Sequence, residues 1–223
     1  MESRRKADAL IEAGRVKVNG KPVFDFSFQV DLDSDQLTVD GHILEVFALD
    51  YVAFNKPRGI LTTCSDDRGR RTVLDVLPGD LGHLKPVGRL DYDSEGLLIL
   101  TNDGELAAAL THPSHEVPKL YRVTVSGAMS DNDLKSLASG VRLSEGMTKK
   151  AWVRKISANS RSTTFEIELR EGRNRQIRRM CAKLGLSVIR LVRVAIGGLQ
   201  LGHLESGSWR RLTSHELSVL YPK

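Results

Sequence analysis

Alternating apolar and polar residues predict β-strands along most of the chain. In residues 163–170, apolar side chains alternate with charged ones, which is the pattern of a strand with one buried face. Residues 119–125 alternate in the same way and place Tyr121 on the more apolar face. Asn19-Gly20, flanked by valines, predicts a hairpin. We expect further strands at residues 29–32, 37–39, 51–55, 60–63, 97–101 and 188–194.

Helical spacing of apolar residues predicts several helices between these strands. Ile177, Met180, Cys181 and Leu184 lie at i, i+3, i+4 and i+7, and Gly185 is suited to end that helix. Capping residues predict further helices after Ser3, Thr72, Ser130 and Thr213, and the turn Asn102-Asp103-Gly104 is expected to start another.

Many strands with a few interspersed helices are typical of an α+β protein. For residues 49–223 we expect a mostly antiparallel sheet with flanking helices. For residues 1–48 we expect a small N-terminal α/β domain. No apolar run is long enough to span a bilayer, and the basic start is not followed by the apolar core of a signal peptide. The pattern therefore argues against a membrane protein.

Basic residues outnumber acidic ones, with 33 Lys and Arg against 28 Asp and Glu and a net charge of +5. Such a balance favours a polyanionic partner, most often nucleic acid. Near the N-terminus, a basic helix start leads into a hairpin with one basic face, a combination that suits the phosphates of structured RNA. The cations concerned are Arg4, Arg5, Lys6, Arg15 and Lys17.

The cysteine and histidine pattern argues against a metal site. Cys64 and Cys181 are far apart, in apolar contexts, and fit a reducing cytoplasm. His112 and His115 are closely spaced, but no cysteine or third histidine lies near them in the sequence. We therefore expect no metal and a cytoplasmic location.

One acid stands out on a loop bounded by glycines. Asp91 lies between Gly88 and Gly96, close to Arg89 and just before an apolar strand. Glycine lets such a loop turn sharply and approach a ligand closely. A carboxylate held there beside an arginine is a candidate nucleophile or general base. The alternative is an ordinary turn or capping residue.

The arginines of Glu171–Met180 differ in where a helix would place them. Arg178 lies about 100° from Ile177 around the helix, at the border of the apolar stripe, and could reach along the core edge into a cleft. Arg175 and Arg179 lie near the opposite side and are expected to face solvent or phosphate. Tyr121 is either a core residue or a platform on which a nucleic-acid base stacks.

The N-terminal stretch SRRKADALIEAGRVKVNGKPV resembles a small RNA-binding domain. That domain is shared by a small-subunit ribosomal protein, tyrosyl-tRNA synthetases and several RNA-modifying enzymes. The resemblance runs from Ser3 to about Val46. The chain starts after the position of the domain's usual first helix, so we expect an incomplete or trimmed domain.

Five motifs in order resemble the ribosomal-RNA pseudouridine synthases that carry this N-terminal domain. They are KPRG, GRLDYDSEGLLILTNDG, the HP after the next helix, KLYRV and EGRNRQIRRM. The resemblance implies isomerisation of a uridine to pseudouridine without cofactor or metal. It places the family's catalytic aspartate on Asp91, its active-site tyrosine on Tyr121, and the basic residue that pairs with the aspartate on Arg178.

The implied reaction requires the target uridine to leave the RNA stack, at a cost of a few kcal/mol. Asp91 could attack the uracil ring, attack the anomeric carbon or remove a sugar proton, and the sequence leaves these alternatives open. Tyr121 would stack on the flipped base, and Arg89 would hold its phosphate or fill the emptied position. Further cations expected to contact RNA are Lys56, Arg89, Arg173, Arg175 and Arg179.

The expected substrate is ribosomal RNA, and the EGRNRQIRRM stretch favours the large subunit. The alternatives are the same activity on small-subunit RNA, or a non-catalytic protein that binds ribosomal RNA or assists ribosome assembly. A monomer is expected.

Overall fold

The computed structural model describes residues 4–31, 34–45 and 47–220. The chain divides into two compact units, Met1–Ala48 and Leu49–Lys223, and each is described by itself. Ser3, the expected cap of the first helix, lies outside the described residues.

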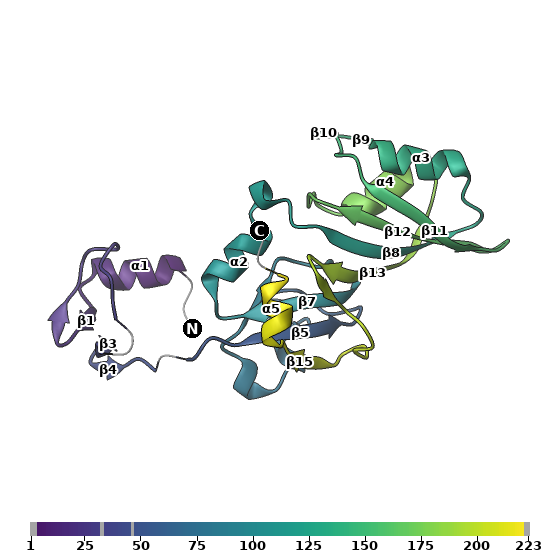
Figure 1. The fold of residues 1–223 in the computed structure, drawn as a ribbon. Helices are drawn as coiled ribbons and strands as arrows, with labels where there is room; N and C mark the ends of the chain where they lie inside the picture. The colour runs from purple at the N-terminus through teal and green to yellow at the C-terminus, as the bar shows by residue number, and fades with distance from the viewer. Residues whose placement is uncertain (1–3, 32–33, 46, 221–223) are drawn as a thin grey trace. The chain divides into compact units, whose positions relative to one another are not determined.

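The N-terminal unit combines one helix with four short strands (Figure 1). Helix α1 covers Arg4–Glu12, and the antiparallel strands follow the order β2-β1-β3-β4. Asn19 and Asp40, at the two hairpin turns, have φ of 51° and 52°, a conformation that asparagine and aspartate tolerate. The strands are β1 (Val16–Val18), β2 (Lys21–Pro22), β3 (Leu37–Val39) and β4 (His42–Ile43).

The strand expected at residues 29–32 is wrong for residues 29–31, which are irregular, and residue 32 lies outside the described residues. The polar residues around it bind one another instead of a neighbouring strand. Asp25 accepts hydrogen bonds from the backbone and hydroxyl of Ser27, and Ser34 donates to Asp31. Such short side chains compete with a strand ladder for backbone groups.

The second unit is built on a nine-stranded sheet. Its strands follow the order β11-β12-β8-β13-β7-β5-β15, with β6 against β7 and β14 against β13. All pairs are antiparallel except β13 with β7, which confirms the expected α+β class. The strands are β5 (Tyr51–Lys56), β6 (Lys85–Val87), β7 (Glu95–Thr101), β8 (Lys119–Ser126), β11 (Trp152–Ala158), β12 (Ser162–Leu169), β13 (Val188–Ile196), β14 (Leu199–Gln200) and β15 (Trp209–Arg211).

Helices cover different parts of this sheet (Figure 1). Helices α3 (Asp131–Ser139) and α4 (Gln176–Lys183) pack on the β8 and β12 side, whereas α2 (Gly104–Thr111) and α5 (Ser214–Ser218) pack beside β5 and β7. Both faces of β5 and β7 are buried, which explains why these strands are continuous apolar runs. The remaining elements are β9 (Arg142–Leu143), β10 (Gly146–Met147) and the 3₁₀ turns η1 (Leu74–Val76), η2 (Gly79–Leu81) and η3 (Pro113–His115).

Helix caps agree with the sequence at α3 and α5, which begin with capping boxes at Ser130 and Thr213. Helix α2 begins at the expected turn, where Asp103 is its cap. The helix expected after Thr72 is only the single 3₁₀ turn η1, because the Thr72 hydroxyl donates to Asp75 instead of accepting a backbone hydrogen bond.

Residues 60–63 do not form the expected strand. They make one isolated bridge, between Leu61 and Thr72. The Thr62 hydroxyl donates to the carbonyl of Leu90, and the Thr63 hydroxyl donates to the carbonyl of Ser65. These side-chain bonds tie the segment to neighbouring loops.

Both cysteines are free, but their settings differ. Cys181 is buried, and burial raises the pKa of its thiol to about 12. Cys64 is exposed, so its expected apolar setting is wrong. Within the described part of the chain, no group of three or more His, Cys, Asp or Glu side chains is placed to hold a metal, and no helix there is long and apolar enough to cross a membrane.

Gly96, the first residue of β7 after Glu95, is required by a close approach of two strands. Its φ is +105°, and a Cβ there would overlap the backbone oxygen and nitrogen of Arg193 on β13. Gly146 has a similar φ of +114° but faces open space. Comparing alanine at the two positions therefore separates steric overlap from backbone strain.

We expect Gly96→Ala to lower the free energy of unfolding of this unit by roughly 1–3 kcal/mol more than Gly146→Ala, because overlap with backbone adds to a shared strain. Urea unfolding followed by tryptophan fluorescence measures this difference, since Trp152 and Trp209 are the chain's two tryptophans and both lie in this unit. Equal losses for the two variants would contradict the close approach.

Candidate active site

A buried lysine forms hydrogen bonds with the backbone of the loop that joins β6 to β7. Lys56 has 0% exposure, and its Nζ donates to the backbone oxygens of Pro57, Asp91 and Ser94 at 3.0, 3.2 and 2.9 Å. A backbone bond from Gly59 to Tyr92 adds a further tie. The backbone that carries Asp91 is therefore fixed at several points.

Lys56 is buried, so its expected role as an RNA contact is wrong. Burial lowers the pKa of its amine to about 8, although nearby carboxylates oppose the shift. Its three donors are all used by backbone oxygens, and none is left for a ligand. The lysine acts within the protein.

Two arginines at the start of α4 reach the Asp91 loop. Arg175 makes a bidentate contact with Asp93, with both nitrogen–oxygen distances at 2.9 Å, and lies 3.7 Å from the Asp91 carboxylate. Arg178 lies 3.2 Å from the Asp93 carboxylate and donates to the Asp93 backbone oxygen at 2.8 Å. The hydrogen bond from Arg175 holds the pKa of Asp93 below its usual range, and burial lowers the pKa of Arg178.

These contacts correct one expectation and extend another. Among the described residues, Arg178 forms its ion pair with Asp93 and not with Asp91. Arg175 is exposed, as expected, but its guanidinium also binds the acidic loop. Its φ is 46°, at the cap position before the helix, so helical spacing does not govern where its side chain points. Asp93 is the anchor for both arginines.

Tyr121 extends from β8 and is half-buried between two apolar clusters. Its cross-strand partner is Arg193 on β13. Tyr121 thus lies on the apolar face that alternation predicts, and it also borders a cleft. Its packing against the two clusters confirms the core interpretation, and its role as a stacking platform stays a prediction.

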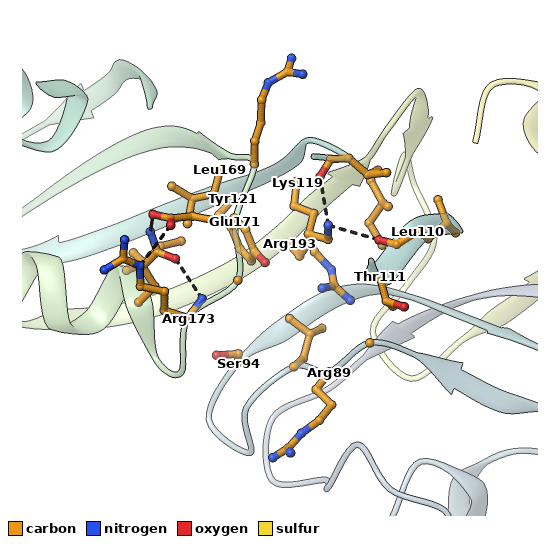
Figure 2. A pocket seen from close by; sticks show the side chains of 18 of the residues that line it. Arg89, Ser94, Leu110, Thr111, Lys119, Tyr121, Leu169, Glu171, Arg173 and Arg193 are labelled. Atoms are coloured by element: carbon orange, nitrogen blue, oxygen red, sulfur yellow. Dashed lines mark hydrogen bonds and ion pairs between the residues drawn. The ribbon is translucent and has the colours of Figure 1, made fainter. Parts of the chain in front are cut away.

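A cleft of about 650 Å³ brings the site residues together. Asp91 and Tyr121 line it, as do Arg89, Lys119 and Arg193. Figure 2 shows Tyr121, Lys119 and Arg193 on one wall, with Arg89 and Ser94 on the other. A volume of this size is in the range of small-molecule sites. Arg178 is not among the residues that line the cleft, and it contacts Asp93 instead.

Three cleft residues were not expected from the sequence. Lys119 donates to the backbone oxygens of Leu110 and Val117, and burial lowers the pKa of its amine to about 8. Ser94 and Arg193 are buried. The available signal was weak: Arg193 is a charged residue inside an apolar strand, and Lys119 precedes Tyr121 by two positions.

The other expected RNA contacts differ in their exposure. Arg89 and Lys17 are exposed, as is Lys6, whereas the side chains of Arg4 and Arg5 lie outside what the structure describes. Three further arginines form ion pairs with intramolecular acids. The pairs are Arg15 with Asp40, Arg173 with Glu171, and Arg179 with Glu145.

The chain was compared with family models, curated proteins and solved structures. Residues 50–183 match the sequence model of the RNA pseudouridylate synthases, and residues 1–37 match that of the S4 domain. The ribosomal large subunit pseudouridine synthase B of Bacillus subtilis is 43% identical over 98% of this chain and 90% of its own length. The chain belongs to the RNA pseudouridylate synthase family.

A second relative and a solved structure extend the comparison. The Vibrio cholerae protein named ribosomal large subunit pseudouridine synthase B is 40% identical, over 98% of this chain and 70% of its own length. A pseudouridylate synthase crystal structure aligns with a TM-score of 0.72 at 31% identity, covering 98% of this chain and 94% of the other. The matched family region contains Asp91, Tyr121 and Arg178 but ends before Arg193.

The buried amine of Lys56 predicts a pH-dependent stability. An unfolded lysine keeps its proton up to a pKa of about 10.4, whereas folded Lys56 loses it above about 8. Between these values the unfolded state binds more protons, so the burial penalty is progressively relieved as pH rises. The free energy of unfolding should then increase relative to Lys56→Met by about 1.4 kcal/mol for each pH unit.

Urea titrations of wild type and Lys56→Met between pH 7 and 10 measure this difference. Subtracting the two curves removes other titrating groups, including Lys119. A flat difference for Lys56→Met would contradict the lowered pKa.

Proposed function

We propose that this enzyme isomerises a specific uridine of large-subunit ribosomal RNA to pseudouridine in the cytoplasm. The names of the Bacillus and Vibrio relatives support this substrate. The observation that carries the proposal is the cleft itself, which is lined by both the Asp91 carboxylate and the ring of Tyr121.

Asp91 is the proposed catalytic residue. Its backbone oxygen is held by Lys56, and its carboxylate faces Arg175 at 3.7 Å while remaining 29% exposed. A fixed and accessible carboxylate suits attack on the uracil ring, attack on the anomeric carbon or removal of a sugar proton. Each of these roles uses the carboxylate form of Asp91.

Base flipping is proposed to bring the uridine to Asp91. Tyr121 presents a ring at the cleft, and stacking a base on such a ring stabilises it by roughly 1–3 kcal/mol. That gain offsets much of the cost of leaving the RNA stack, about a few kcal/mol. Arg89, exposed at the opposite wall, is placed to meet the flipped nucleotide's phosphate or the emptied position.

Arg178 acts in this proposal as a positioning residue through Asp93. It binds both the carboxylate and the backbone oxygen of Asp93, two residues after Asp91. Arg175 bridges the two acids. The pair of arginines thus orients the catalytic loop against α4.

The S4 domain, proposed to span residues 1–48, would supply further contacts with RNA phosphates. The exposed side chains of Lys6 and Lys17 support this role, and Arg4, Arg5 and Arg15 lie on the same small unit. In the second unit, Arg173, Arg175 and Arg179 gather near the cleft and are proposed to attract RNA by charge while bound to their acids.

Asp91→Asn should lower pseudouridine formation by roughly 10³–10⁴-fold, because the amide is neither a nucleophile nor a base. Tritium release from RNA labelled at C5 of uridine measures turnover. RNA binding should survive, and Asp80→Asn, at an exposed position, should retain activity.

Pseudouridine mapping of ribosomal RNA with and without the protein tests the function and locates the target. A new modification in the small-subunit RNA would correct the substrate. Absence of any new pseudouridine, or tritium release by Asp91→Asn, would contradict the proposal.

Tyr121→Phe should retain most activity, whereas Tyr121→Ala should lose roughly 10- to 100-fold, because stacking requires the ring and not the hydroxyl. Single-turnover rates on the mapped RNA separate the two variants. Equal losses would mean that the hydroxyl, rather than the ring, is needed.

A further inference from the structure

Arg193 is a buried cation with most of its hydrogen-bonding capacity unused. Its exposure is 2%, and its Nε donates to the backbone oxygen of Leu97 at 2.7 Å. Its Nη2 finds no acceptor among the described residues, and no described carboxylate lies within ion-pair distance of it. A buried guanidinium normally has a paired anion, because an unpaired charge in a low-dielectric site is costly.

The unused nitrogen belongs to a residue that lines the cleft. Ser94, across the cleft, also has a buried oxygen with no hydrogen-bond partner among the described residues. Figure 2 shows Arg193 projecting from the wall that carries Tyr121 and Lys119 toward the side of Ser94. Two unsatisfied polar atoms therefore border the same space.

Lys119 adds a second cation to this wall. Its amine binds only backbone oxygens among the described residues, and the charge of Arg193 lies near enough to oppose its protonation. The Arg193 wall thus has a buried guanidinium and a half-buried amine.

Two carboxylates other than Asp91 line the cleft, Glu116 and Glu171, but they form ion pairs with Lys149 and Arg173 and not with these two cations. The wall that carries the two cations is built for an anionic or strongly polar oxygen from a ligand.

The strand geometry aims Arg193 at this position. The β13–β8 register is irregular between Arg193 and Ala195, as in a β-bulge, and such irregularities re-aim side chains. Arg193 is directly cross-strand from Tyr121, and Gly96 packs against its backbone. Arg193 is therefore held beside the proposed stacking platform by its neighbours on both sides.

We propose that Arg193 and Lys119 form a subsite for a uracil carbonyl oxygen of the flipped uridine and stabilise the negative charge that develops there. This inference rests on the proposed function and adds residues to the same site. The base is favoured over a phosphate because Arg193 is almost fully buried beside Tyr121, whereas the exposed Arg89 is available to a backbone phosphate.

The electron balance of the isomerisation places charge at that oxygen. When the bond between C1′ and N1 breaks, its electron pair enters the uracil ring and is shared with the carbonyl oxygens. A bond from C5 to C1′ then forms, C5 loses its proton, and N1 ends protonated. If Asp91 instead adds to the ring first, the displaced pair again reaches a carbonyl oxygen. An N–H of Arg193 donates to that oxygen in either route.

Arg193→Met is the main variant, because methionine fills similar space without donors. Its single-turnover rate on the mapped RNA should fall by roughly 10²–10³-fold, as expected for a lost preorganised donor. RNA affinity should change by less than about threefold. Arg154→Met, which removes an exposed arginine whose partner Glu166 keeps Arg122, should behave as wild type.

Sulfur substitution identifies the oxygen that Arg193 meets. The single-turnover rate of wild type should fall on RNA that carries 2-thiouridine or 4-thiouridine at the target, because sulfur is a poorer hydrogen-bond acceptor. The rate of Arg193→Met should not fall further on the same RNA. If Arg193 is only structural, Arg193→Met should show the same rate loss on thiouridine RNA as wild type. If Arg193→Met does not fold, Arg193→Lys replaces it in the comparison of rates on uridine and thiouridine RNA. Lysine keeps the positive charge but lacks the guanidinium.

A parallel series with methylphosphonates flanking the target tests the phosphate as the ligand. If Arg193→Met removes the methylphosphonate penalty and leaves the thiouridine penalty, the proposed subsite is overturned. Equal rates for wild type and Arg193→Met would also overturn it. Wild type that forms no pseudouridine on any RNA would instead overturn the proposed function.

Discussion

The parallel pairing of β7 with β13 is the contact on which the site depends. It rests on two register pairs, Val192 with Glu95 and Arg193 with Gly96. The loop that carries Asp91 leads directly into β7, whereas Tyr121 lies on β8, the antiparallel neighbour of β13. The short pairing therefore sets the distance between the two walls of the cleft.

Gly96 makes this pairing possible because it has no side chain to separate the strands. The same closeness lets the Arg193 guanidinium bind the Leu97 backbone oxygen. Strand packing and the polar lining of the cleft thus depend on one another. A larger residue at position 96 would disturb both.

Three cations, two of them fully buried, lie on two sides of the cleft. Lys56 binds backbone oxygens beneath the Asp91 loop, and Lys119 and Arg193 line the opposite wall. Because backbone oxygens carry only partial charge, they satisfy the lysines' donors without neutralising the positive charge. Asp91 and Asp93 lie on the loop, Lys56 binds the backbone of that loop, and the other two cations lie on the opposite wall. This arrangement suits a substrate whose charge distribution changes during the reaction.

The sequence by itself determined the features that depend on local periodicity and on nearby residues. Alternation located β8 and β12, a long apolar run located β7, and capping residues located α3 and α5. The same pattern placed Tyr121 on its apolar face. It failed at residues 29–31 and 60–63, where threonine, serine and aspartate side chains bind loop backbone and polar neighbours, an outcome that strand propensity does not encode.

Tertiary structure decided which charges meet. The sequence marked Asp91 and Arg178, but only the packing of α4 against a loop some 80 residues earlier paired Arg178 with Asp93 and brought Arg175 onto the same acid. Tertiary packing also buried Lys56 and left the Arg193 Nη2 without an acceptor among the described residues. Local spacing reports which face of its own element a residue occupies. The residue that it contacts on that face belongs to a strand or helix distant in the chain. The local repeat pattern of the sequence therefore cannot predict that contact.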